Sequence, residues 1–426
     1  MAVRPATGNR ASSTYISHVV VIIQENRSFE NFFAGFPGAN APTEGYAFNH
    51  HHIRVKVNLH QTTFETNPNL PHDWKGAISD YDGGNMDGFH TGPGSNYAAY
   101  AYIDRTQITP YWDMAEQYVL ADAMYPTEFG GSFTGHLTAV SGTDNINKTE
   151  AQVNYPTAGP NDCDAPPGTK SSLVQEYPYR QVGLGNGPFP CFNQWRVLPE
   201  VLDAHNVSWK FYVDRLLDAG IWSPFEASRY VRYGPDWNKD MVAPQSRVLK
   251  DIAHGKLAAV SWVTPSKDDS DHPEAHDDLG PSWVASIVNA VGTSPYWDST
   301  AIVVIWDDWG GFYDNAMPPQ LDFRGLGIRV PCLIISPYAK MGSGSGGYVS
   351  HTQYEFGSIV KFIEEVFDLP VLGVPSKGYT DTRATSIMDS FDFTQSPRKF
   401  KKFGSKYPAS RFINEQPPAS DEPDDE

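Results

Sequence analysis

Acidic and amide side chains follow two apolar runs that lie far apart along the chain. They are Glu25 and Asn26 after residues 18–24, and Asp307 and Asp308 after residues 301–306. If both runs are strands of one open α/β sheet, these side chains meet beyond the carboxyl ends of the strands. Buried acids at close range repel each other, and a divalent cation relieves that repulsion. The pattern predicts a metal site, although solvated strand ends beside turns would give the same spacing.

A serine between glycines is the candidate nucleophile. Residues 130–136 read Gly-Gly-Ser-Phe-Thr-Gly-His, and an apolar-leaning stretch follows. A helix that starts near Ser132 would turn backbone N–H groups and its positive end toward the hydroxyl. A metal ion beside the hydroxyl would further stabilise the alkoxide and make a nucleophile without a dedicated histidine base. Gly-Gly-Ser is also a common turn sequence, so both interpretations stay open.

Histidines near polar loops are candidates for phosphate binding or for proton transfer. His90 follows Met-Asp-Gly-Phe, and His272 lies in Ser-Asp-His-Pro soon after an apolar run. Either side chain could bind a phosphoryl oxygen or protonate a leaving group. A purely structural histidine is the alternative at both positions.

The elements that must position these residues alternate along the chain. Continuous β-branched runs predict strands covered on both faces, with a helix between the second and the third run. The strands are expected at residues 18–24, 257–264, 301–306 and 330–336, and the helices at 112–118, 197–205, 281–291 and 354–367. This alternation predicts a three-layer α/β/α sandwich with a mostly parallel sheet.

We expect one domain over residues 15–400 with long insertions at about 36–111 and 143–190. Both insertions are rich in residues that favour loops, and long loops in a compact domain usually shape the rim of a site. The Pro- and acid-rich tail at 416–426 cannot bury a core, so it is predicted to be disordered.

Charge and hydropathy exclude several classes of partner. The formal net charge over 426 residues is −18, which argues against sequence-independent binding to nucleic acid. No run of eighteen apolar residues exists, so we expect no integral membrane segment. Residues 1–14 lack the apolar core of a signal peptide.

The cysteines indicate the cellular compartment in which the protein resides. Cys163 and Cys191 lie in Gly/Pro-rich sequence and could pair, whereas Cys332 lies inside an apolar run and suits a small core residue. A bridge that closes a loop of about thirty residues would contribute roughly 3–4 kcal/mol and indicate an oxidising compartment. Three unrelated buried thiols are the alternative. We therefore expect a secreted or periplasmic protein, with any signal peptide absent from this chain.

Four motifs, in the same order along the chain, resemble segments of the bacterial phospholipase C and acid phosphatase family of phosphoesterases. This family includes the plant non-specific phospholipases C. Residues 25–29 match its ENRSF segment, and residues 307–314 resemble its acidic DD/DE-x-x-G-x-x-D segment. Residues 327–338 look like its G-x-R-V-P…ISP segment. With residues 132–143 between them, the resemblance spans roughly residues 17–368.

The resemblance implies an alkaline-phosphatase-like fold and a covalent phosphoseryl or phosphothreonyl intermediate. It implies Ser132 as a nucleophile that also touches the metal, and His90 and His272 as phosphate-side histidines. Asp314, the last acid of the acidic segment, joins the candidate catalytic residues. The implied metal ligands are Glu25, Asn26, Asp307, Asp308 and Ser132. Oxygen ligands favour Ca²⁺, Mg²⁺ or Mn²⁺ over a structural zinc, although zinc stays open.

The sequence departs from the family pattern at two positions. Many relatives read T-x-P-N-R where this chain has Ser-Phe-Thr-Gly-His136, and D-H-V where it has Asp-Asn315-Ala. If the missing histidine assists departure of the leaving group, the task passes to His136, His272 or water.

These residues predict hydrolysis of a phosphate ester by two in-line displacements through Ser132. A phospholipase C acting on glycerophospholipids such as phosphatidylcholine is preferred, because aromatic-rich insertions suit a lipid or its headgroup. A broad acid phosphatase acting on small phosphate esters is the first alternative. An inactive relative that binds phosphorylated ligands is the second. A sulfatase is disfavoured, because the Cys/Ser-x-Pro-x-Arg context of that chemistry is absent.

Overall fold

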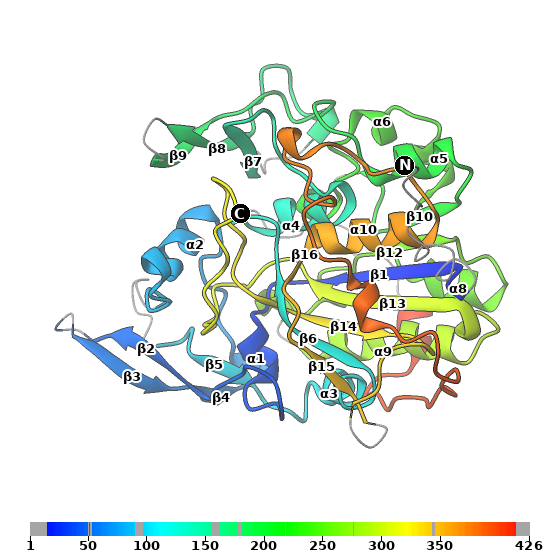
Figure 1. Cartoon of the computed structure of the whole chain (residues 1–426), viewed down its shortest axis with the longest axis horizontal. Helices are drawn as coiled ribbons and strands as arrows, with labels where there is room; N and C mark the ends of the chain where they lie inside the picture. The colour runs from blue at the N-terminus through cyan, green and yellow to red at the C-terminus, as the bar shows by residue number, and fades with distance from the viewer. Residues whose placement is uncertain are drawn as a thin grey trace, which may run out of the picture.

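A nine-stranded sheet forms the centre of the molecule (Figure 1). The computed structural model describes residues 15–49, 51, 53–89, 97–154, 162–177, 181–217, 219–275, 277–342 and 346–414. The strand order is β11 (Met241–Val242), β10 (Trp209–Tyr212), β12 (Val260–Val263), β1 (His18–Gln24), β13 (Thr300–Trp306), β14 (Val330–Ile335), β6 (Val119–Tyr125) and β15 (Tyr348–Ser350), with β16 (Tyr354–Glu355) also paired to β6.

The sheet is mostly parallel, as the sequence predicts. Strand β1 pairs in parallel with β12 and β13, so that Val21 lies between Trp262 and Val303. Strand β14 is antiparallel to both of its neighbours, β13 and β6, which makes β6 parallel to β13. The side chains of β13 are buried on both faces of the sheet, which explains the continuous apolar run.

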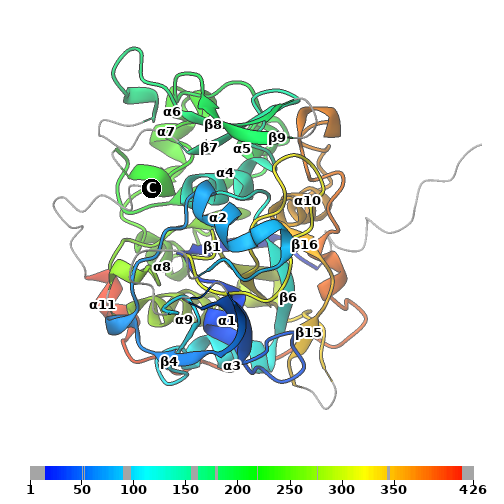
Figure 2. The same ribbon diagram turned by 90° about the vertical axis from the view of Figure 1, so that its left-hand side faces the viewer.

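Helices cover both faces of this sheet, and the two views agree on the layers (Figures 1 and 2). Helices α4 (Ser132–Ser141) and α10 (Phe356–Val366) pack together on one face. Helices α3 (Thr109–Gln117) and α9 (Leu279–Gly292) pack together on the other. The remaining helices are α1 (Phe29–Phe33), α2 (Trp74–Tyr81), α5 (Leu198–Ala204), α6 (Arg229–Arg232), α7 (Asp236–Lys239), α8 (Arg247–Ala253) and α11 (Ala409–Ile413). The predicted α/β sandwich is confirmed.

The two insertions contain small sheets of their own. The first holds the pair β2 (Glu44–Phe48) and β3 (Arg54–Asn58), and the pair β4 (His60–Thr62) and β5 (Ala101–Ile103). The second holds a three-stranded sheet of β7 (Glu150–Asn154), β8 (Ser172–Tyr177) and β9 (Gln181–Asn186). The second insertion is therefore more regular than its loop-like composition predicts.

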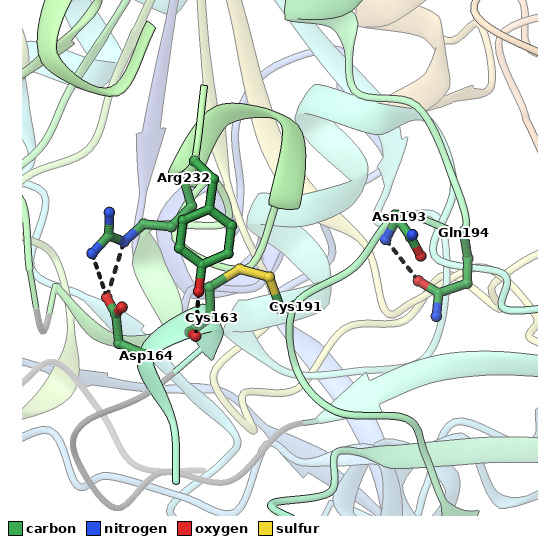
Figure 3. The surroundings of a disulfide bond; sticks show 7 residues. Cys163, Asp164, Cys191, Asn193, Gln194 and Arg232 are labelled. Carbon is green, nitrogen blue, oxygen red and sulfur yellow. Dashed lines mark hydrogen bonds and ion pairs between the residues drawn. A yellow bond between two sulfur atoms is a disulfide. The ribbon is translucent and has the colours of Figure 1, made fainter. Parts of the chain in front are cut away.

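The cysteines follow the predicted arrangement. A disulfide joins Cys163 and Cys191, which are 28 residues apart in sequence (Figure 3). Cys332 is a free thiol buried in β14. The hydroxyl of Tyr233 donates to the Cys163 carbonyl at 2.8 Å, which attaches the bridge to the segment after α6. No helix in the described part of the chain is long and apolar enough to cross a membrane. The predicted tail at 416–426 lies outside the described residues.

Removing the disulfide should destabilise the protein through the entropy of the unfolded chain. We expect Cys163→Ala/Cys191→Ala to lower the free energy of unfolding by about 3–4 kcal/mol, measured by urea denaturation. Cys332→Ala, which trims a core side chain and opens no loop, is the control. A double variant as stable as the parent would contradict the expectation.

Candidate active site

The topology brings the candidate residues to one edge of the sheet. Strands β1, β6, β12 and β13 are parallel, so the segments that leave their carboxyl ends meet at the same edge. Those segments carry Glu25 and Asn26 after β1, Ser132 after β6, His272 after β12, and Asp307 and Asp308 after β13.

Ser132 lies in a buried hydrogen-bonded group with an amide and a carboxylate. Asn26 Nδ2 donates to Ser132 Oγ at 3.0 Å and to Asp308 Oδ2 at 3.1 Å. The Ser132 hydroxyl donates to Asp308 Oδ2 at 3.3 Å. Ser132 is the first residue of α4, directly after the N-cap Gly131. The hydroxyl is therefore at the positive end of a helix and beside a carboxylate that can accept its proton.

A second group consists of Glu25, His136 and Asp307. His136 Nε2 lies 2.8 Å from Glu25 Oε1 and 3.8 Å from Asp307 Oδ2. Each residue offers one atom that could bind a metal, and these atoms lie within 4.8 Å of one another. The backbone N–H of Asn26 donates to Asp307 Oδ1 at 3.0 Å and joins this group to the one around Ser132. Burial lowers the pKa of His136 to about 4, so its imidazole is neutral near pH 7.

Unsatisfied buried oxygens support a cation in this place. Asn26 Oδ1 and Asp307 Oδ2 are buried and accept no hydrogen bond in the described part of the chain. Within these described residues, Asp307 has an ion-pair contact with His136 and with no other side chain. A buried carboxylate oxygen that has neither a donor nor a cation is costly, so the group can hold a metal ion. His136 adds a nitrogen to the predicted oxygen ligands, which keeps Zn²⁺ and Mn²⁺ among the candidates.

Glycines allow the segments to approach this closely. A Cβ on Gly135 would lie 2.5 Å from the Asp307 carbonyl oxygen, so α4 reaches the loop after β13 only with glycine at this position. Gly310 has φ +63°, and a Cβ there would lie 2.1 Å from the Asn26 carbonyl oxygen. Asn26 itself has φ 51°, a left-handed conformation that asparagine tolerates better than most residues.

A row of rings contains a histidine that sequence reasoning missed. The His272 ring lies 6.1 Å from the Trp222 ring and 6.0 Å from the ring of buried His72. The Trp222 ring is in turn 6.4 Å from His136. His72 lies in the first insertion, beside the N-cap Asp73 of α2. In the sequence, the feature that could have identified His72 is its position in Pro-His-Asp-Trp, within an insertion that is expected to line the site.

Asp314 does not join either group. Asp314 accepts three hydrogen bonds from the Arg329 guanidinium: Nε lies 2.9 Å from Oδ1 and 3.2 Å from Oδ2, and Nη2 lies 3.1 Å from Oδ2. The same guanidinium donates to Asn315 Oδ1 at 3.0 Å. Asp314 thus neutralises a buried arginine and also accepts from the backbone N–H of Glu30. His90 lies outside the described residues.

Comparison with known proteins places the chain in a class and then in a family. Its mixed α/β fold and its serine beside buried carboxylates agree with a hydrolase acting on phosphoric ester bonds. Residues 16–370 match the model of the phosphoesterase family, and the chain belongs to that family. Both the family resemblance and the enzyme class predicted from the motifs are confirmed.

Curated relatives are similar over most of this chain. Phospholipase C B of Mycobacterium tuberculosis is 25% identical over 456 residues, which cover 91% of this chain and 80% of the relative. Non-hemolytic phospholipase C of Pseudomonas aeruginosa is 24% identical over 421 residues, which cover 85% of this chain and 55% of the relative. A crystal structure of an alkaline phosphatase superfamily protein from Vibrio parahaemolyticus has a TM-score of 0.39 and 10% identity, covering 88% of this chain and 72% of that one.

Removing one ligand of the proposed metal should lower metal content. We expect Asp307→Asn to weaken binding of a divalent cation at least about tenfold, because a neutral amide replaces a buried carboxylate. Elemental analysis after dialysis measures the bound metal. Asp314→Asn is the matched control: it breaks a buried ion pair and should lower the melting temperature, yet keep the metal. Full metal content in Asp307→Asn would rule out this ligand.

Proposed function

We propose that the protein is a metal-dependent phosphoesterase that forms a phosphoserine intermediate on Ser132, and that it is a phospholipase C acting on glycerophospholipids such as phosphatidylcholine. The observation that carries the proposal is the hydroxyl of Ser132 at the start of α4, 3.3 Å from Asp308 Oδ2 and 3.0 Å from Asn26 Nδ2. The names of the relatives support the choice of a phospholipid substrate.

In the first displacement, Ser132 Oγ forms a bond to phosphorus and the bond from phosphorus to the diacylglycerol oxygen breaks. Asp308 accepts the hydroxyl proton along their hydrogen bond. The Asn26 amide orients Oγ by donating to it. A divalent cation held by Glu25, Asp307 and neighbouring ligands would supply positive charge to the phosphoryl oxygens.

The leaving oxygen needs a proton, and we assign it to a water molecule that His272 positions. The backbone N–H of Glu274 donates to His272 Nδ1 at 3.1 Å, so the ring carries its proton on Nε2, where it can donate a hydrogen bond to that water. Loss of the Nε2 proton itself would leave an imidazolate, so the water gives up the proton and becomes hydroxide. His136 Nε2 is held against Glu25 at 2.8 Å, which suits a metal ligand better than a leaving-group acid.

In the second displacement, this hydroxide attacks phosphorus and the bond to Ser132 Oγ breaks, which releases the phosphorylated headgroup. The proton on Asp308 returns to Oγ. Asp308 and Ser132 end in their starting states and one water has been consumed, so the cycle closes.

We also propose that the protein works outside the cytoplasm. The disulfide between Cys163 and Cys191 supports this location, because such bridges persist in oxidising compartments.

Loss of the nucleophile should abolish turnover without unfolding the protein. We expect Ser132→Ala to lower kcat at least about a thousandfold. The parent should yield a phosphorylated peptide containing Ser132 after acid quenching, detected by mass spectrometry. Ser286→Ala is the matched control, since this buried helix serine donates to the Ser282 carbonyl of its own helix at 2.8 Å. Near-full activity of Ser132→Ala would overturn the proposed mechanism.

The ratio of monoester to diester hydrolysis separates a phospholipase C from an acid phosphatase. The measurement is kcat/KM for nitrophenyl phosphate divided by kcat/KM for nitrophenyl phosphorylcholine. We expect a ratio below roughly a hundred, which corresponds to about 2.7 kcal/mol of transition-state preference. A larger ratio would favour the phosphatase. No turnover of either ester in the metal-loaded parent would favour an inactive phospholigand-binding relative.

A further inference from the structure

A cavity of about 520 Å³ lies apart from the candidate active site. Its walls come from residues 192–196, 228–230 and 372–374, together with Glu200, Lys377 and Tyr379. None of the residues placed in the candidate active site lines it. Its volume is within the range of sites that bind small molecules.

Cationic side chains gather at this cavity in a strongly acidic protein. Arg196, Arg229 and Lys377 line it, and all three residues are exposed to solvent. Glu200 offsets part of this charge, since its Oε2 lies 3.7 Å from Arg196 Nε. The remaining charge is positive, which favours an anion, and guanidinium groups match the geometry of a phosphate.

Aromatic and aliphatic side chains form the rest of the wall. The rings of Phe192 and Trp195 stack at 4.6 Å, and both residues are buried. Tyr379 is also buried, and its hydroxyl accepts from the backbone N–H of Arg196 at 2.6 Å. Val374 is 50% exposed at the same cavity and adds an aliphatic side chain to its wall.

The disulfide and backbone hydrogen bonds hold one side of the wall in place. The disulfide anchors the segment that begins at Cys191, and Asn193 and Gln194 follow along the same loop (Figure 3). The Phe192 N–H donates to the Ala227 carbonyl at 2.7 Å, and the Arg229 N–H donates to the Phe192 carbonyl at 3.0 Å. A preformed wall lowers the entropy cost of binding.

We propose that this cavity binds an amphiphile with a phosphate head. The phosphate would lie among Arg196, Arg229 and Lys377, and the apolar part would lie against Trp195 and Val374. Because no residue is shared with the candidate active site, the proposal stands apart from the proposed catalysis and can be tested without it.

The test measures binding in a Ser132→Ala background, where turnover is prevented, with a chelator present. Isothermal titration calorimetry compares inorganic phosphate, glycerol phosphate and dihexanoyl phosphatidic acid below its micelle concentration. We expect the phosphatidic acid to bind at least about tenfold more tightly than inorganic phosphate, because only the lipid contacts both parts of the cavity.

Substitutions then locate the site. Arg196→Gln/Arg229→Gln should weaken binding of the phosphatidic acid at least about tenfold. The charge-matched control is Lys56→Gln/Arg105→Gln, which removes exposed cations outside the cavity and should leave binding unchanged. Thermal melting checks that each variant folds, and Lys377→Gln replaces the double variant if it does not. Equal loss in the cavity and control variants, or equal affinity for inorganic phosphate and the lipid, would overturn the proposal.

Discussion

The burial of carboxylates at the ends of β1 and β13 is the constraint on which the rest of the site depends. Taking an ionised carboxylate out of water costs several kcal/mol unless a cation compensates. Elsewhere the chain supplies that cation itself, as Arg329 does for Asp314 and Arg324 does for Asp144. Asp307 is equally buried, but its recorded ion-pair partner in the described residues is the imidazole of His136. The same fold thus satisfies structural acids with arginine and leaves this group suited to a metal.

The side chains of residues 24–27, at the end of β1 and directly after it, contact two different parts of the site. Glu25 and Asn26 point to the candidate metal and to Ser132. The neighbouring side chains point the other way: Gln24 Oε1 accepts from the Asp271 N–H at 3.0 Å, and Arg27 Nε donates to the Asp271 carbonyl at 2.7 Å. These bonds hold the backbone directly before His272. Residues 24–27 therefore connect the part of the site that holds Ser132 with the part that holds His272.

Strong local patterns made the central fold and much of the candidate site predictable. The apolar runs of β1, β13 and β14 stop where polar residues begin, and the topology of a parallel sheet then brings those residues together. Strand β6 was missed, because its sequence Val-Leu-Ala-Asp-Ala-Met-Tyr has few β-branched residues and directly follows a helix. Its Asp122 reads as a surface residue, yet it is buried and accepts from His351 and from the Asn40 N–H. Such tertiary partners leave no mark on the local sequence.

Contacts across long sequence separations also decided which candidates belong together. His136 reads as a helix residue four positions after Ser132, and only the approach of α4 to the loop after β13 brings it to Glu25 and Asp307. That approach depends on Gly135, where any side chain would collide with the Asp307 carbonyl. One helix therefore delivers the nucleophile from its first turn and a candidate metal ligand from its second, since residues i and i+4 share a helix face. Any shift of α4 along its axis would move both groups together, so the separation of Ser132 from His136 is set by helix geometry and not by loop conformation.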